Sequence, residues 1–212
     1  MLHWLARARA ALIPPAGSAG GLLVDLGCGA GLLAPYVADK GYRHVGVDLT
    51  ASALTQAAAH GVRPVRADVT AVPLVDGCAD VVTAGEILEH VPDQSAAVAE
   101  ACRLLRPGGL LVIDTLAATT VARVVAVGLA ERVPGGPPPG IHDPALFVDR
   151  TLLRRDCARH GVDLQLRGIR PSLVDLARWL TGRIDSVRMV PVPTTAVLFQ
   201  GVGRRERRAG HG

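Results

Sequence analysis

The stretch Asp25-Leu26-Gly27-Cys28-Gly29-Ala30-Gly31 decides the fold of this chain. It follows a short apolar run at 22–26, which predicts a buried strand, and precedes a segment of helical composition at 32–40. A glycine-rich turn between strand and helix lies at the carboxyl edge of an open α/β sheet, where such sheets bind ligands. Glycines let the backbone approach a ligand closely, and the helix N-terminus offers free N–H groups. The stretch therefore predicts a ligand site at this turn.

The alternation of short apolar runs with helical segments continues to residue 115 and is typical of βαβ units in a parallel sheet. The predicted strands are 22–26, 44–48, 63–67, 79–84 and 109–114, and the predicted helices between them are 32–40, 51–60 and 93–105. We expect one doubly wound, Rossmann-like α/β domain spanning residues 1–212.

The rhythm changes after Thr115. A predicted helix at 119–133 and the Gly/Pro loop at 134–140 form a lid-like insertion at about 117–150. Further helices are predicted at 151–160 and 172–180, and further strands at 162–166 and 195–202.

Composition indicates a soluble globule, because 49% of the 212 residues are hydrophobic and 20% are charged. No apolar run approaches the roughly 20 residues that a membrane-spanning helix needs. Arg7 and Arg9 interrupt the N-terminal apolar stretch, which argues against a signal peptide and for the cytoplasm. The net charge is +4, yet aromatic residues make up only 3%, so we expect no nucleic-acid partner.

Two acidic residues follow the next predicted strands. Asp48 comes 21 residues after Gly27, where a carboxylate can accept hydrogen bonds from both hydroxyls of a ribose. Asp68 closes the third strand, in a place suited to an adenine amino group. The dinucleotide fingerprint G-x-G-x-x-G is absent, because Leu32 stands where its third glycine would be.

This pattern resembles the class I S-adenosylmethionine-dependent methyltransferases, whose motif D-x-G-x-G-x-G is present in full. The resemblance covers about residues 20–115 and implies S-adenosylmethionine as cofactor. It also implies an antiparallel C-terminal hairpin, which the strands near 162 and 195 could form. The implied cofactor contacts are Asp25, Gly27, Cys28, Gly29, Asp48, Leu49, Asp68, Val69 and Gly85.

A second cluster follows the fourth predicted strand, in Gly85-Glu86-Ile87-Leu88-Glu89-His90-Val91-Pro92-Asp93. If residues 86–90 form one helical turn, Glu86, Glu89 and His90 share a face, at positions i, i+3 and i+4. Carboxylates and imidazole together suit a divalent cation. The alternative is an ordinary solvated helix face, with Asp93 capping the next helix.

The segment EILEHVPD, followed by RLLRPGGLLVIDTLAAT and by the later GIHDPALF, resembles the O-methyltransferases that act on polyprenyl catechols in ubiquinone synthesis. Its E-x-x-E-H spacing is also similar to that of small-RNA 2′-O-methyltransferases, which hold Mg²⁺. The resemblance implies a divalent metal, Mg²⁺ in the first instance, with the ligands Glu86, Glu89, His90 and His142. If they are not ligands, His90 or His142 could serve as general base. Asp143-Pro144 could also simply cap and start a helix.

The leading hypothesis is a metal-assisted O-methyltransferase for a phenolic or catechol-like small molecule, with or without an isoprenoid tail. Alternatives are RNA 2′-O-methylation, a nicotinamide oxidoreductase and a cofactor-binding regulatory protein without turnover. For Arg7 and Arg9 a solvated helix face is favoured over a place in the pocket. For the apolar stripe of 119–133, packing on the sheet is favoured over contact with a greasy substrate or a membrane surface.

Overall fold

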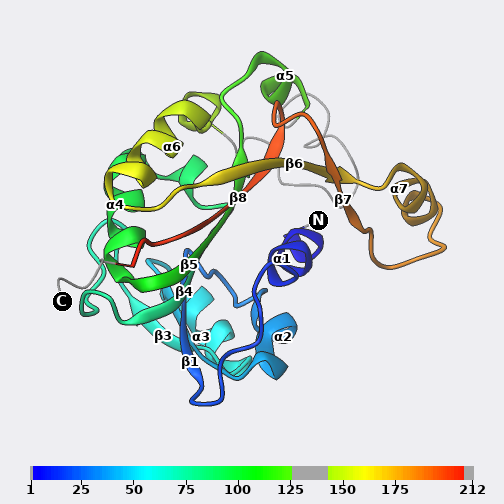
Figure 1. Ribbon diagram of the computed structural model, residues 1–212. Coiled ribbons are helices and arrows are strands. Elements are labelled where there is room, and N and C mark those ends of the chain that lie inside the picture. Colours follow the sequence, from blue (N-terminus) through cyan, green and yellow to red (C-terminus); the bar gives the residue numbers. More distant parts are fainter. Residues whose placement is uncertain (1, 126–142, 208–212) are drawn as a thin grey trace.

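A computed structural model describes residues 2–125 and 143–207, and within them all strands join one mixed sheet (Figure 1). The strands are β1 (Gly21–Leu26), β2 (Tyr42–Asp48), β3 (Arg63–Arg66), β4 (Ala79–Gly85), β5 (Leu105–Leu116), β6 (Gln165–Pro171), β7 (Met189–Val192) and β8 (Leu198–Arg204). The helices are α1 (Leu2–Ala10), α2 (Ala34–Val37), α3 (Ala51–Ala59), α4 (Gln94–Leu104), α5 (Thr120–Arg123), α6 (Arg150–Arg159) and α7 (Leu173–Leu180).

The strand order is β3-β2-β1-β4-β5-β8-β6-β7. Strands β1 to β5 are parallel, whereas β8 runs antiparallel to both β5 and β6, and β7 runs antiparallel to β6. The predicted doubly wound sheet with antiparallel C-terminal strands is therefore confirmed. The sequence prediction did not include β7, a four-residue strand at the sheet edge.

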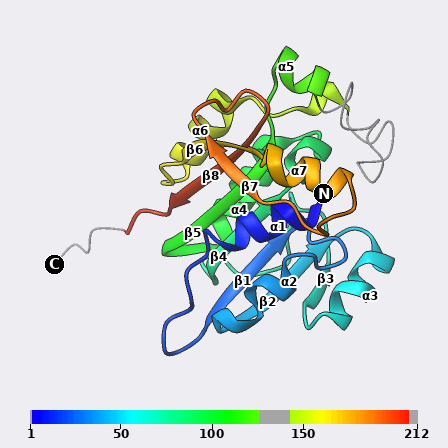
Figure 2. The same cartoon turned by 90° about the vertical axis from the view of Figure 1, so that its right-hand side faces the viewer.

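Helices cover both faces of the sheet (Figure 2). On one face, α4 and α6 pack against alternate side chains of the central strands, such as Leu26 and Ile113. On the other face, α1 and α2 cover Leu23 and Val112. Residues 81–85 of β4 and 109–116 of β5 are buried on both faces of the sheet, which explains why most of them are apolar.

One predicted helix differs from the structure in its first turn. The segment predicted to be helical from residue 32 stays in a turn through Leu33, so that α2 starts only at Ala34. By contrast, Asp93 caps α4 as predicted, because its carboxylate accepts a hydrogen bond from the Ala96 N–H at 2.9 Å.

The insertion after β5 begins with the short helix α5, and residues 126–142 of the predicted helix and loop lie outside the described residues. Ala122 packs against Leu116 and Phe147, but Val121 and Val124 are more than half exposed. The prediction that this stripe packs on the sheet is therefore wrong for both valines. Within α5, Ala122 is the buried residue.

Within residues 2–125 and 143–207, we find no helix with the length and apolar character needed to cross a bilayer.

Candidate cofactor and catalytic site

The glycine turn leaves β1 with three left-handed residues, at φ values of 68° for Gly27, 52° for Gly29 and 79° for Gly31. A Cβ on Gly27 would lie 2.6 Å from Ile87, whereas a Cβ on Gly29 would meet nothing within 4 Å. The backbone at Gly29 therefore faces open space, and a ligand can approach it closely. Gly31 instead packs against Ala57 of α3.

Asp48, the last residue of β2, holds this turn in place. Its Oδ2 accepts a hydrogen bond from the Gly29 N–H at 2.9 Å, and its Oδ1 accepts one from the Thr50 N–H at 2.8 Å. Each carboxylate oxygen has a second lone pair, so Asp48 can still accept hydrogen bonds from the hydroxyls of a ribose. The structure thus brings Asp48 and the glycine turn together, as predicted.

The other predicted cofactor contacts around this turn differ in exposure. Leu49 is 60% exposed beside Asp48, and Asp68 is exposed two residues beyond β3. Backbone and side-chain hydrogen bonds from Thr70 lower the pKa of Asp68. Val69 is buried, and the Cys28 side chain points into the core against Gly46, so Cys28 can offer a ligand only its backbone.

Asp25, the acid that opens the motif, is almost fully buried. Its Oδ1 accepts a hydrogen bond from the Thr83 hydroxyl at 2.5 Å and lies 4.0 Å from Nη1 of Arg9. Its Oδ2 lies 3.7 Å from Nε2 of His44. Asp25 is therefore held by neighbouring side chains of the protein.

Sequence reasoning missed Arg9, which it had placed on a solvated helix face. The side chain is buried, and its guanidinium donates two hydrogen bonds to the Asp114 carboxylate, at 2.7 Å and 3.0 Å. It lies so close against Gly85 that a Cβ there would stand 1.7 Å from Cζ of Arg9. Arg7, in contrast, is exposed as predicted. The one sequence signal for the burial of Arg9 was its position within an apolar N-terminal stretch. That signal is ambiguous without the tertiary structure.

The predicted helical turn over residues 86–90 is wrong. Glu86 follows β4 with a left-handed backbone, at φ 53°, and only Leu88–His90 form a short 3₁₀ helix. Glu89 is 1% exposed, whereas His90 is exposed, so the two do not share a face. The Glu86 backbone N–H donates a hydrogen bond to the Asp114 carbonyl at 2.8 Å, and its backbone is left-handed. Residues 86–90 therefore do not form one continuous helical turn.

Glu86 and Glu89 nevertheless come close to each other, and both lie near Arg9 and Asp114. Burial raises the pKa of Glu86 well above its usual range, and the Glu89 and Asp114 carboxylates raise it further. Burial also raises the pKa of Glu89 to about 7, although the 2.6 Å hydrogen bond from the Thr115 hydroxyl opposes this shift. One oxygen of each glutamate, Oε1, is buried without a hydrogen-bond partner.

Among the described residues, no group of three or more histidine, cysteine or carboxylate side chains is arranged so that it could hold a metal ion. Of the predicted ligands, Glu86 and Glu89 are neighbours, His90 is exposed, and His142 lies outside the described residues. Asp143 caps a short 3₁₀ helix that starts at Pro144, as the alternative interpretation predicted.

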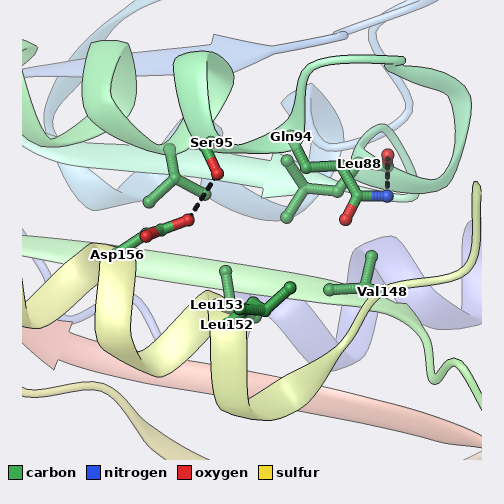
Figure 3. A pocket seen from close by; sticks show the side chains of 8 residues that line it. Leu88, Gln94, Ser95, Val148, Leu152, Leu153 and Asp156 are labelled. Atoms are coloured by element: carbon green, nitrogen blue, oxygen red, sulfur yellow. Dashed lines mark hydrogen bonds between the residues drawn. The ribbon is translucent and has the colours of Figure 1, made fainter.

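A small cavity lies between α4 and α6, away from the glycine turn (Figure 3). Its volume is about 50 Å³, which is room for water rather than for a nucleoside. Ser95 of α4 and Asp156 of α6 point toward each other across it, and the Ser95 hydroxyl donates a 2.6 Å hydrogen bond to Asp156. This hydrogen bond joins the two helices, so we assign the cavity to packing.

Known methyltransferases are similar to this chain in sequence. A family described as "Methyltransferase domain" matches residues 24–113. A ubiquinone biosynthesis O-methyltransferase from Cupriavidus pinatubonensis is 36% identical over 162 residues, covering 73% of this chain and 65% of the relative. Its counterpart from Leptothrix cholodnii is 32% identical over 169 residues, covering 75% and 72%.

The fold has solved counterparts as well. A methyltransferase from Thermotoga maritima superposes with a TM-score of 0.70 at 16% identity, covering 97% of this chain and 89% of that one. This likeness concerns the fold alone. The chain spans 65% of the length of the Cupriavidus relative.

Proposed function

This chain belongs to the S-adenosylmethionine-dependent methyltransferases, in the family of the ubiquinone biosynthesis O-methyltransferases, and on that premise we propose that it methylates a hydroxyl of a phenolic or catechol-like small molecule. The observation that carries the proposal is the pairing of Asp48 with the Gly29 N–H, at 2.9 Å, next to open space above the turn.

The residues around the turn suit this cofactor. The backbone at Gly27 and Gly29 would hold its amino-acid and ribose portions, and Asp48 would accept hydrogen bonds from the ribose hydroxyls. Asp68, two residues beyond β3, would face the adenine. The cofactor, when bound, supplies a methyl group on a sulfonium, ready for in-line displacement by an oxygen nucleophile.

The chain must then orient the acceptor hydroxyl and remove its proton. His90 is our proposed base, because it is exposed and follows β4 at the carboxyl edge of the sheet. His142 is proposed for the same role because its segment, GIHDPALF, resembles the corresponding segment of the ubiquinone-pathway O-methyltransferases. Glu86 and Glu89 precede His90 in the same segment and lie close to each other.

Support for a lipophilic phenol comes from two directions. The relatives are named for ubiquinone biosynthesis. In addition, the segment after β5 exposes Val121 and Val124, which a greasy acceptor could contact. A substrate with an isoprenoid tail would meet both conditions.

Assistance by a divalent metal is a separate proposal, with Glu86, Glu89, His90 and His142 as ligands. The two unpartnered Oε1 atoms of Glu86 and Glu89 favour it. The exposed position of His90 and the lack of a three-ligand cluster in the described residues do not. We therefore assign no step of the reaction to a metal.

Titration calorimetry and turnover together test the proposal. We expect S-adenosylmethionine to bind and NAD not to bind, which separates a methyltransferase from a nicotinamide enzyme. A panel of catechols with and without prenyl tails, run beside short RNA, should yield methyl ethers from the catechols alone. Methylated RNA, or cofactor binding without any turnover, would contradict the proposed acceptor.

A further inference from the structure

A row of residues crosses the sheet from β4 to β6 at the edge that carries the glycine turn. Gly85, the last residue of β4, pairs with Asp114 of β5. Asp114 pairs with Gln200 of β8, which in turn pairs with Arg167 of β6 (Figure 1). Residues directly opposite each other on neighbouring strands point to the same face of a sheet. That face is the one under α1, because Arg9 donates its hydrogen bonds to Asp114.

Gln200 holds the Arg167 guanidinium through a neutral oxygen. Nε and Nη2 of Arg167 donate hydrogen bonds to Oε1 of Gln200, at 3.2 Å and 2.9 Å. A guanidinium has only donors, so Oε1 must face it and the amide nitrogen Nε2 must point away. Nε2 is buried and has no hydrogen-bond partner among the described residues. A glutamate here would pair with Arg167 and leave no such donor, so the amide fixes the guanidinium without neutralising it.

The positive charge of Arg167 is available to a ligand. Gln200 is fully buried, whereas Arg167 is exposed. Three of the five N–H donors of a guanidinium remain once two are bonded to Gln200, and they include both on Nη1. Arg167 forms no salt bridge with another described residue, in contrast to Arg9. An oriented, exposed cation without a counter-ion suits an anionic group.

The position of Arg167 relative to the cofactor contacts points to the methyl acceptor as this ligand. The proposed contacts Gly27, Asp48 and Asp68 stand at or just beyond the ends of β1, β2 and β3. The strands β5, β8 and β6 lie on the other side of β4. In-line displacement needs the acceptor on the far side of the methyl group from the cofactor. Arg167 stands on that side.

We propose that Arg167 binds a carboxylate of the acceptor, which makes the substrate a phenolic acid, and that Gln200 positions the guanidinium for it. This inference rests on the function proposed above and narrows its acceptor. An arginine and a carboxylate form two parallel hydrogen bonds, which fix the orientation of an aromatic ring as well as its place. A neutral catechol offers Arg167 no such partner.

Three matched acceptors test the role of the carboxylate. Protocatechuate, its methyl ester and catechol share two adjacent hydroxyls, and only protocatechuate carries a carboxylate. We expect kcat/KM for protocatechuate to exceed that for the ester at least about tenfold. Arg167→Gln should remove this preference, mainly by raising KM for the acid, and should leave kcat/KM for catechol and the ester within about twofold.

Two further variants control this result. Arg170→Gln removes an equally exposed arginine of the same strand and should keep the preference for the acid, which separates Arg167 from net charge. Gln200→Glu places a carboxylate against Arg167 and should remove the preference while the activity on catechol stays, because the guanidinium is then neutralised in place. A preference that survives in Gln200→Glu would contradict the positioning role of Gln200. Thermal unfolding confirms that each variant is folded.

Calorimetry distinguishes failure of this inference from failure of the proposed function. Protocatechuate should bind in the presence of S-adenosylhomocysteine, and Arg167→Gln should weaken this binding at least about tenfold. Such binding without turnover would support the carboxylate site and contradict O-methylation. Conversely, equal turnover of all three acceptors, or an unchanged KM and affinity for protocatechuate in Arg167→Gln, would overturn the carboxylate site and leave the O-methyltransferase in place.

Discussion

Arg9 and Asp114 form a buried ion pair that joins the first helix to the fifth strand, with Nε to Oδ2 at 2.7 Å across 105 residues of sequence. Burial disfavours the charged guanidinium, but the Asp114 carboxylate outweighs this effect and holds the pKa of Arg9 above its usual range. The nearby carboxylates of Asp25 and Glu86 raise the pKa of Arg9 further.

Removing only one partner of this pair should be costly. Arg9→Met leaves Asp114 buried without its cation, so we expect the free energy of unfolding to fall by about 3–5 kcal/mol. Replacing both residues, as Arg9→Met with Asp114→Leu, should recover most of that loss. Urea unfolding measures both. A single variant as stable as the unaltered chain would contradict a stabilising role for the pair.

The buried Glu89 predicts a pH dependence of stability. Its pKa is about 7 in the folded protein against 4.5 in the unfolded chain, so the folded state keeps a proton that the unfolded chain releases. Stability should therefore fall as pH rises from about 4.5 to about 7. Glu89→Gln, measured by thermal unfolding, should be more stable than the unaltered chain by about 1–3 kcal/mol at pH 8, with the two converging near pH 4.

Glu100 provides a control of opposite sign. Hydrogen bonds from Arg103 lower the pKa of Glu100, so its contribution is present at neutral pH and fades as pH falls. Glu100→Gln should be less stable than the unaltered chain at pH 7. If both glutamine variants changed the stability in the same direction, the different environments of Glu89 and Glu100 would not govern the pH dependence of stability.

The two glycines of the turn should respond differently to alanine. Gly29→Ala places its Cβ in open space and costs about 1 kcal/mol for the left-handed backbone. Gly27→Ala bears the same strain and also drives a Cβ against Ile87, so we expect a larger fall in stability, by about 1–3 kcal/mol more. Denaturation midpoints compare the stability of the two variants. Equal losses of stability would show that the Ile87 side chain moves aside at little cost.

Asp48→Ala should weaken S-adenosylmethionine binding at least about tenfold, because charge-assisted hydrogen bonds contribute roughly 1.5–3 kcal/mol each. The loss of the Gly29 and Thr50 contacts would loosen the turn in addition. Calorimetry on the folded variant gives the affinity, and Asp39→Ala, at an exposed position beyond α2, is the control. Unchanged affinity would remove Asp48 from the cofactor site.

Chelation tests the metal proposal. If a divalent ion is held at Glu86 and Glu89, a chelator should abolish methyl transfer and leave cofactor binding nearly intact, because the proposed cofactor contacts lie mainly at the ends of the first three strands. Glu89→Ala should mimic the chelator. Full activity of a Glu89→Ala/His90→Ala variant in chelator would leave an acid–base methyltransferase without metal.

The amino-acid sequence by itself predicted the architecture and half of the site. Alternating apolar and helical runs are local signals, and every strand except the short edge strand β7 had such a signal. The glycine turn and Asp48 were predictable for the same reason, because both stand at strand ends and parallel strands end at one edge.

Only the tertiary structure decided the other half. Arg9 meets Asp114 because α1 crosses the sheet at β5, and no local periodicity encodes a contact between residues so far apart. Glu86 takes a left-handed backbone because its N–H bonds to the neighbouring strand, and that single turn buries Glu89 while exposing His90. Spacing along a chain predicts a shared helical face only where a helix forms. Here the pairing of β4 with β5 extends to Glu86, and no helix forms over residues 86–90.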